Sequence, residues 1–535
     1  MASTDSEKVD KEDLQEDSCD INADLEQGLP TNDAEYGEPD TPAADKEKKT
    51  SDDETFQVQF APNDPSNPHN FNKYFKAWLC LQMSILALCG SLGSSIISPA
   101  QGVLAKKFNV SDEVMVLATS LYVLGFALGP VVWAPISELH GRKLSMLPAV
   151  FIQGLFSIGT ANSQNAAALF ITRFFGGVFG SAPVSNVSAA LGDFYEPNER
   201  GTAIAVYSIC VIGGPTIGPV IGAALTVNRN LGWRWTVYIE AIFSFFMVAL
   251  TTVCLPETYA PVILARKARK LRKAEGDSRY WQPHERDKIT ARTLITKHLS
   301  RPIRYVKPLA KQRFKSALII PRMLLTEPMV TCITFYASFC YGILYLNLQV
   351  FPIVFEQHRH WPLVTSTLPF LGLLVGVLCA TFINLGNQPI YAKAVKANGG
   401  KAVPEARLPP MLIGGVLFVI GLFWFGWTAE PGVQWIVPVI ASAFIGAGFN
   451  VVFQQCLNYL VDSYGLYAAS AVSANTFLRS LLASGLPMAA MPMFNRMGVG
   501  PAMSVLGAVA AVLLPAPVLF MRYGAWLRAK SRFAS

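Results

Sequence analysis

Twelve apolar runs, separated by shorter polar segments, constrain the fold of this chain more than any other feature. Each run supplies the roughly 20 apolar residues that a helix needs to cross a bilayer. Backbone polar groups find no water in the hydrocarbon core, so the runs are expected to be helices. We expect an all-α membrane protein whose twelve transmembrane helices lie near residues 77–99, 113–133, 144–162, 166–190, 202–226, 234–255, 329–350, 362–384, 410–428, 433–458, 466–490 and 501–522.

The distribution of charge divides the chain into tails, a linker and two halves. Residues 1–70 hold 20 acidic residues against 5 lysines, and so polar a segment cannot bury a core. Two similar halves around a midplane site are typical of secondary transporters. The expected parts are a disordered acidic cytoplasmic tail (1–72), an N-terminal six-helix bundle (73–258), a basic cytoplasmic central loop (259–327), a C-terminal six-helix bundle (328–524) and a basic cytoplasmic tail (525–535).

The loop charges predict the orientation, because short cytoplasmic loops carry an excess of Lys and Arg. An even number of spans places both termini on one side. Loops on that side carry Arg142, Lys143, Arg200, the basic 259–327 segment, Lys393, Lys396, Lys401 and Arg407. Loops on the other side carry only Lys106, Lys107, Arg229, Arg359 and Arg496. We therefore expect both termini to be cytoplasmic and the outside sequon at Asn109 to be a glycosylation site. The central loop is either an amphipathic segment on anionic lipid or a solvated charge run.

Arg173 and Glu240 are charged residues within apolar runs, where an unpaired charge costs several kcal/mol. Arg173 lies in the fourth run and Glu240 in the sixth. Intramembrane charges are candidates for proton coupling or substrate binding. The alternatives are a structural arginine bonded to backbone carbonyls and a glutamate at the membrane interface.

The fifth run contains a doubled G-P-x-x-G pattern. Gly214, Gly218 and Gly222 repeat every four residues and share one helix face, which allows close approach of a neighbouring helix. Pro215 and Pro219 are expected to bend this helix. General small-residue packing is the simpler interpretation.

These patterns resemble motifs of the major facilitator superfamily. The turn A-P-I-S-E-L-H-G-R-K (134–143) is similar to its loop signature G-x-L-a-D-r-x-G-R-K, with Glu138 replacing Asp and Ala134 replacing Gly. The fifth run resembles the antiporter signature g-x-x-x-G-P-x-x-G-G, with Ala223 replacing the last Gly. The fourth run resembles R-x-x-x-G, with Arg173 and Gly177 at its two positions.

Five further segments are similar to the twelve-span drug:proton antiporter family of fungi, in the branch of multidrug and polyamine exporters. The resemblance extends from about residue 70 to the end of the chain. The segments are L-P-E-T-Y-A-P (255–261), Y-G-I-L-Y-L (341–346), P-E-A-R-L-P-P (404–410), N-T-F-L-R-S (475–480) and R-Y-G-A-W-L-R-A-K-S-R-F-A (522–534).

The resemblance implies roles for several residues. Glu138 would lie against the start of the eleventh span near Tyr464–Gly465, and Arg142 would pair with Asp193. With Gly141 and Lys143 they would form a cytoplasmic gate. The fifth-span glycines and prolines would form a hinge and proton seal facing the second bundle. Arg173 would face the cavity.

Polar and aromatic residues within spans are candidates for the substrate cavity, although helix-to-helix hydrogen bonding is the alternative for each. The two arginines of the spans, with few acids beside them, favour neutral, amphipathic or anionic substrates over polyamines. The candidates are Tyr122, Tyr341, Tyr345, Asn347, Gln349, Asn450, Gln454, Gln455, Asn475 and Arg479.

The sequence therefore predicts a proton-coupled exporter of drugs, toxins, secondary metabolites or organic acids, with the proton gradient as its energy source and no cofactor. The alternatives are a symporter for uptake and a transporter-like receptor. No Walker A loop, H-E-x-x-H motif or nucleophile elbow occurs, so an ATP-driven pump or an enzyme is not expected. The basic body reflects cytoplasmic loops and not nucleic-acid binding. We expect a monomer in the plasma membrane, with the vacuolar membrane as the alternative, and no metal site or disulfide.

Overall fold

The computed structural model of the chain describes residues 56–277, 279–282, 328–399, 403–464 and 468–530. Within these residues, twelve helical segments are long and apolar enough to cross a membrane. This confirms the expected all-α architecture with twelve spans. Most of the predicted acidic tail and residues 283–327 of the predicted central loop lie outside the described residues.

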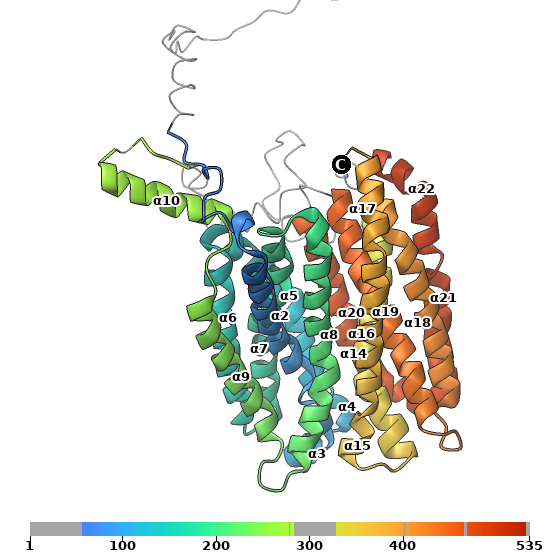
Figure 1. Cartoon of the computed structure of the whole chain (residues 1–535). Helices are drawn as coiled ribbons and strands as arrows, with labels where there is room; N and C mark the ends of the chain where they lie inside the picture. The colour runs from blue at the N-terminus through green and yellow to red at the C-terminus, as the bar shows by residue number, and fades with distance from the viewer. Residues whose placement is uncertain (1–55, 278, 283–327, 400–402, 465–467, 531–535) are drawn as a thin grey trace, which may run out of the picture. The chain divides into compact units, whose positions relative to one another are not determined.

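The first six spans form the N-terminal half (Figure 1). Helix α2 packs along α7 and α8, α5 packs along α7, and α6 packs on both α7 and α9. The elements are α2 (Lys73–Ser95), η2 (Ser98–Ala100), α3 (Gln101–Phe108), α4 (Asp112–Met115), α5 (Leu117–His140), α6 (Arg142–Ala161), α7 (Ala166–Gly192), α8 (Pro197–Val227) and α9 (Arg234–Cys254).

The other six spans form the C-terminal half. Helix α19 packs along α16 and α18, α14 packs along α20, and α18 packs on α21. The elements are α14 (Pro328–Phe351), the π-helical η5 (Pro352–His358), α15 (Leu363–Thr367), α16 (Pro369–Gly386), α17 (Gln388–Ala397), η6 (Pro404–Arg407), α18 (Leu408–Thr428), α19 (Ile436–Tyr464), α20 (Ala468–Met497), α21 (Val499–Leu513) and α22 (Ala516–Lys530).

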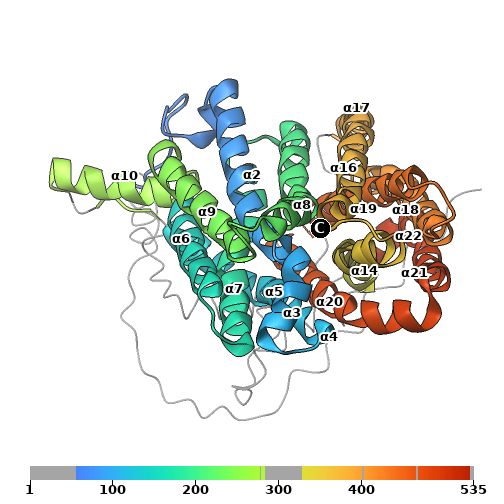
Figure 2. The same ribbon diagram turned by 90° about the horizontal axis from the view of Figure 1, so that it is seen from below.

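The two halves meet along two helix pairs, α5 with α20 and α8 with α16 (Figure 2). Val123 of α5 and Ile212 of α8 belong to the same buried apolar cluster as the core of the C-terminal half. Apolar burial therefore joins the halves, and polar side chains at this junction are shielded from solvent.

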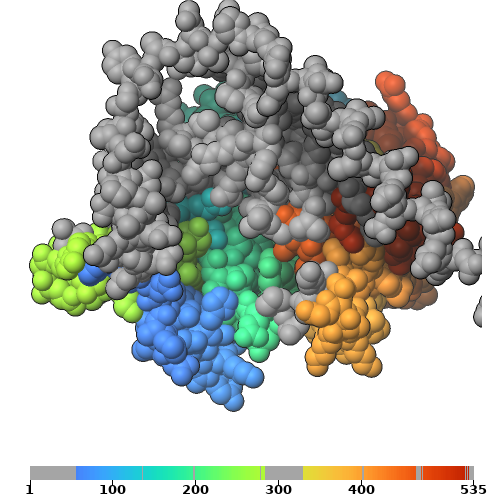
Figure 3. Space-filling view, turned by 90° about the horizontal axis from the view of Figure 1, so that it is seen from above, coloured from blue at the N-terminus to red at the C-terminus, as the bar shows by residue number. Residues whose placement is uncertain are grey.

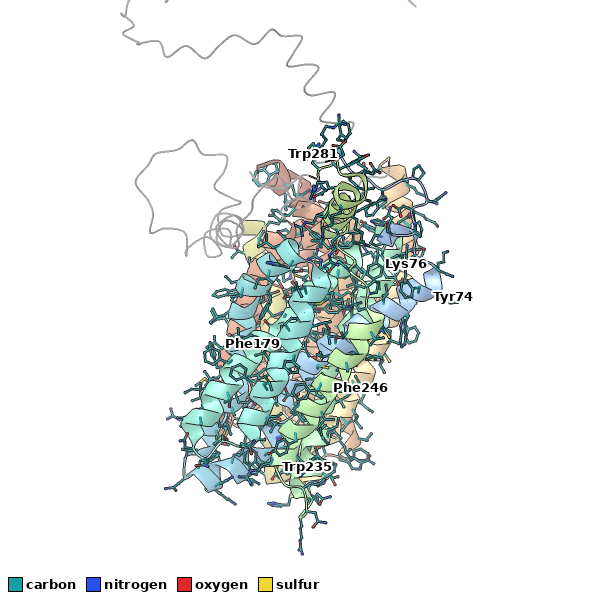
Figure 4. The ribbon with its side chains drawn as sticks, turned by 90° about the vertical axis from the view of Figure 1, so that its left-hand side faces the viewer. Tyr74, Lys76, Phe179, Trp235, Phe246 and Trp281 are labelled. Carbon is teal, nitrogen blue, oxygen red and sulfur yellow. The ribbon has the colours of Figure 1, made fainter. Side chains whose placement is uncertain are left out.

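The outer faces of the helices are apolar, as a lipid-facing surface requires. On α9, Phe246 is 60% exposed and lies along the side of the bundle, and Trp235 lies near one end of the same helix (Figure 4). Aromatic residues near span ends are typical of the membrane–water interface.

Helix α10 (Ala260–Glu275) follows the sixth span and lies at the edge of the helical unit (Figures 1 and 3). Its Lys267 forms an ion pair of 2.7 Å with Asp64, and Gln57 forms a β-bridge with Trp281. Lys267 holds the pKa of the Asp64 carboxyl well below its usual range. The start of the predicted central loop is therefore a basic helix tied to the segment that precedes α2.

Several spans extend beyond their predicted ends. Helix α5 continues through Glu138 to His140, beyond the expected end of this span at residue 133. Polar residues do not end a helix by themselves; here the break comes at Gly141, whose φ of +100° is unfavourable for other residues. The single run predicted at 501–522 is divided into α21 and α22 around Pro515.

Candidate functional site

A polar cluster lies within the N-terminal half, around Arg173 of α7. This guanidinium is 2% exposed and donates hydrogen bonds from Nε to the Ala118 carbonyl at 2.9 Å and from Nη2 to the Gly93 carbonyl at 2.7 Å. A weaker bond from Nη2 reaches the Ser94 carbonyl at 3.3 Å. The ring of Tyr122 lies 4.2 Å from the guanidinium carbon. Backbone carbonyls and a π face therefore satisfy most of this buried charge.

Glu240 of α9 is the acid of this cluster and is fully buried. Its Oε1 atom accepts hydrogen bonds from Gln153 Nε2 at 3.1 Å and from the Tyr122 hydroxyl at 3.5 Å. Its Oε2 atom lies 3.9 Å from Arg173 Nη1 and has no hydrogen-bond partner among the described residues. One carboxylate oxygen is thus held by neutral donors, and the other faces the arginine at a distance too long for a hydrogen bond.

Gln153 of α6 was not among the sequence candidates, although it joins three helices. Besides Glu240, its Nε2 atom donates to the Tyr122 hydroxyl at 3.1 Å and to the Cys89 carbonyl at 3.3 Å. An uncharged residue in an apolar run gives little signal. Its importance depends on partners that are distant in sequence.

Two hydrogen bonds connect the N-terminal half to a face of α14. Ser94 donates to the Ser91 carbonyl at 2.6 Å and lies 2.9 Å from the Tyr345 hydroxyl, so the tyrosine is the donor in that pair. Gln349, one turn further along, donates from Nε2 to Gln101 Oε1 at 3.0 Å. Because Ser94 also offers its carbonyl to Arg173, the arginine cluster is linked directly to the C-terminal half.

A second cationic cluster lies in the C-terminal half, around Arg479 of α20. Its guanidinium carbon lies 4.7 Å from the centre of the Tyr341 ring and 4.8 Å from that of Phe453. Tyr341 also packs against Tyr345, with ring centres 5.2 Å apart. Asn475, one turn before Arg479, donates to Cys456 Sγ at 3.6 Å, and its Oδ1 atom is buried without a partner in the described chain.

The other cavity candidates are placed differently. Asn450 donates to the Val377 carbonyl at 2.9 Å, and Gln455 donates to Asn384 Oδ1 at 2.8 Å. Gln454 accepts a hydrogen bond from Asn384 Nδ2. These three amides of α19 therefore bond to α16 within their own half. Asn347 of α14 is fully buried, and neither of its side-chain polar atoms has a partner within the described residues.

The turn between α5 and α6 carries the predicted gate. Arg142 Nε donates to Asp193 Oδ2 at 2.8 Å, and its Nη1 atom donates to Ser137 at 2.9 Å. Burial raises the pKa of the Asp193 carboxyl, and the Arg142 guanidinium opposes that shift. Lys143 donates to the Thr252 carbonyl at 2.7 Å. The expected contact of Glu138 with Gly465 involves a residue outside the described part of the chain.

Glu257, within the L-P-E-T segment, completes this turn. Its carboxylate accepts the backbone N–H groups of Arg142 at 2.8 Å and Lys143 at 3.3 Å, at the N-terminus of α6. A carboxylate in that position satisfies free N–H groups and the helix dipole. A Cβ atom at Gly141 would lie 2.3 Å from Glu257 Oε2, so a larger residue would displace this carboxylate, in addition to the strain of the positive φ.

The C-terminal half has a corresponding pair that was not expected from the sequence. Arg407, just before α18, lies 3.1 Å from Asp462 near the end of α19, and its guanidinium stacks 3.3 Å from the Tyr391 ring. In each half, an arginine at the start of the third span thus pairs with an aspartate at the end of the fourth. The equivalent positions of these residues in the two halves could have identified the second pair from the sequence.

The glycines of α8 face α2 within the same half. A Cβ atom at Gly214 would lie 2.6 Å from Leu92 N, and one at Gly222 would lie 2.0 Å from the Ile96 carbonyl oxygen. At Gly218, the nearest atom is Ser95 Oγ at 2.2 Å. The shared glycine face therefore meets α2 and not the second bundle. Other residues of α8 contact α16, and the glycines permit close α2–α8 packing.

Asn109 of the sequon is exposed at the end of α3, in the left-handed conformation with φ of 52°. No group of three or more His, Cys, Asp or Glu residues that could hold a metal ion occurs in the described segments.

Known proteins resemble this chain in sequence and in fold. The profile of the Major Facilitator Superfamily matches residues 83–488. A citrinin biosynthesis cluster MFS transporter of Monascus ruber is 41% identical over 91% of this chain and 94% of its own length. An efflux pump of Gibberella fujikuroi, bik6, is 38% identical over 88% of this chain and 93% of its own length. The solved proton:xylose symporter XylE shares the fold, with a TM-score of 0.55 at 15% identity over 85% of this chain and 96% of XylE.

Proposed function

We propose a proton-driven export function for this chain, which belongs to the major facilitator superfamily. Members of this family are transporters and not enzymes, and this chain is a multi-pass membrane protein. The names of its relatives include a secondary-metabolite cluster transporter and an efflux pump. These names favour outward transport of small organic molecules over the two alternatives, uptake by symport and ligand sensing without transport.

The placement of Glu240 carries the proposal of proton coupling. A fully buried carboxyl in a membrane span is a candidate proton carrier, because losing its charge removes a desolvation penalty. Its contact with Arg173 is 3.9 Å and not a hydrogen bond, so protonation breaks no short ionic bond. Gln153 and Tyr122 keep the group in position in either protonation state.

The hydrogen bonds of Arg173 are likewise kept in both protonation states of Glu240. Its hydrogen bonds go to the carbonyls of Ala118, Gly93 and Ser94, which do not titrate. When Glu240 is neutral, the guanidinium keeps these partners and the π face of Tyr122. We expect deprotonation to draw Arg173 toward Glu240 and to weaken its bond to Ser94, the residue that contacts the second half.

Alternating access requires the two ends of the protein to open in turn. The pairs Arg142–Asp193 and Arg407–Asp462 hold corresponding turns in the two halves, and we propose both as parts of the gate at that end. Glu138 and Lys143 would belong to the same gate. The tightly packed α2–α8 face would move as a rigid pair, with Pro215 and Pro219 providing the bend of the hinge.

The orientation of the chain is a proposal based on its loop charges. We propose that the termini and the basic central loop are cytoplasmic, that Asn109 is outside and glycosylated, and that the chain works as a monomer in the plasma membrane. The energy source would be the proton gradient, with no cofactor.

Flux from proteoliposomes tests the proposal. A lipophilic cation, a polyamine, a dicarboxylate and citrinin would each be followed with and without a proton gradient. The comparison set is the wild type, Arg173→Ala, Glu240→Gln and the control Glu356→Gln, which alters a partly buried acid of the C-terminal half. We expect gradient-dependent export of at least one compound, kept in the control and lost in Glu240→Gln.

Other outcomes separate the alternatives. Accumulation of a compound in the same direction as the protons would establish symport and overturn export. Binding of panel members without flux in any lipid composition would support the receptor alternative. Equal proton dependence in the wild type and Glu240→Gln would remove Glu240 from the mechanism.

A further inference from the structure

We propose that Arg479, Tyr341 and Phe453 form a binding site for planar aromatic anions, compounds that carry a carboxylate or phenolate on a ring. This inference rests on the proposed transport function, because it names the substrate class of the same protein. The binding itself requires no proton gradient and can be measured separately.

Arg479 is a buried cation whose hydrogen-bonding groups are unused. The residue is 4% exposed, and its Nε atom is buried with no partner in the described chain. No described residue accepts a hydrogen bond from its guanidinium or forms an ion pair with it. A guanidinium presents five N–H donors in a planar fork that suits carboxylate geometry.

Comparison with Arg173 shows how unusual this environment is. Arg173 is equally buried, but it has three carbonyl partners and Glu240 nearby. Among the described residues, Arg479 contacts the faces of Tyr341 and Phe453 and has no oxygen partner. Aromatic faces attract the cation, but they do not satisfy its N–H groups as oxygen atoms do. The arginine is thus held in place while its donors stay available for a ligand.

The surroundings of Arg479 also suit a flat apolar ligand. Tyr341, Tyr345, Phe449 and Phe453 lie together, with Phe449 and Phe453 stacked at 5.8 Å. Asn475 lies one turn from Arg479 on α20, and its unpartnered Oδ1 atom adds a polar group on the same helix face. Pockets for small molecules typically combine aromatic walls with a few polar groups that fix orientation.

The location of the site favours a transported ligand. Tyr345, which packs on Tyr341, donates to Ser94 of the other half. Val123 and Ile212 of the N-terminal half lie in the same buried cluster as Tyr341 and Phe453. The site formed by Arg479, Tyr341 and Phe453 therefore lies within the spans, where the two halves meet. A ligand bound there would contact groups that separate when the halves move.

Equilibrium binding to the purified full-length chain tests the proposal. Calorimetry at neutral pH would compare three probes with one ring system, namely 2-naphthoate, 2-naphthamide and 2-naphthylmethylammonium. Because charge-assisted hydrogen bonds are much stronger than neutral ones, we expect 2-naphthoate to bind about tenfold or more tightly than the other two. Arg479→Gln should remove this preference, and the exposed Arg496→Gln on the same helix should keep it.

Arg479→Lys is the second test variant, to be used if Arg479→Gln does not fold. The ammonium keeps the charge but lacks the planar fork, so the preference for 2-naphthoate should fall several-fold. Equal binding of all three probes by the wild type, as expected if the arginine binds only water, would overturn the proposal. A preference that survives in Arg479→Gln would also overturn it.

The experiment separates this inference from the proposed function. Selective 2-naphthoate binding without proton-driven flux would preserve the site and reject the antiporter. Proton-driven flux of another panel member without 2-naphthoate binding would reject the site and preserve the antiporter.

Discussion

Replacing Tyr345 with Phe removes the hydroxyl that bonds α14 to Ser94 of α2 and leaves the ring in place. This 2.9 Å bond joins two neutral hydroxyls across the halves. A buried hydrogen bond of this kind contributes about 1 kcal/mol, and about 0.6 kcal/mol on average between membrane helices. Loss of this bond should therefore change the equilibrium constant between the closed and open arrangements of the two halves about three- to fivefold.

Distances between spin labels on the two halves measure this shift. Lys106→Cys on α3 and Gln357→Cys on η5, in a background without the native cysteines, place exposed labels near the end of the spans closed by Gln101 and Gln349. We expect the fraction of long distances to rise about three- to fivefold in Tyr345→Phe.

Tyr336→Phe is the matched control for this measurement. It removes a buried hydroxyl from the same helix, and that hydroxyl has no partner in the described residues. The control should leave the distances unchanged. An unchanged distribution in Tyr345→Phe, or an equal shift in Tyr336→Phe, would refute the assignment of this bond as a link between the halves.

Two further predictions concern the turns at the opposite end. Gly141→Ala forces an unfavourable φ and a contact with Glu257, so thermal unfolding should show a loss of about 1–3 kcal/mol. The control Gly213→Ala should be neutral or stabilising, because the nearest atom to an added Cβ is the Ile217 side chain of the same helix, at 3.9 Å. Arg407→Gln breaks the charged bond to Asp462 and should cost about 1.5–3 kcal/mol by the same assay, while the exposed Lys396→Gln should change little; equal melting temperatures for the two would contradict the second gate pair.

The spans could be predicted because each is a local property of composition. Twelve apolar runs contain enough information to identify twelve helices, but not their ends, since helices continue beyond the apolar core. Helix α5 illustrates this, because it ends only where Gly141 adopts a positive φ. Arg173 and Glu240 were equally visible, because a charge in an apolar run stands out.

Contacts between distant segments were not predictable in the same way. Gln153 and Ser94 are ordinary polar residues in sequence, and only the packing of α2, α5, α6, α9 and α14 gives them partners. The α8 glycines were correctly expected to share a face, but sequence spacing does not show which neighbour that face meets. Arg479 was visible as a charge, whereas its lack of a carboxylate partner required the fold.

Proton movement during transport tests the central claim most directly. A compound that the protein carries would be driven down its own gradient through proteoliposomes, without an imposed pH difference, while a trapped dye follows the internal pH. The account predicts that the wild type moves protons against the direction of the compound, and that Glu240→Gln carries the compound without moving protons. Proton movement in Glu240→Gln equal to that of the wild type, or movement in the same direction as the compound, would contradict it.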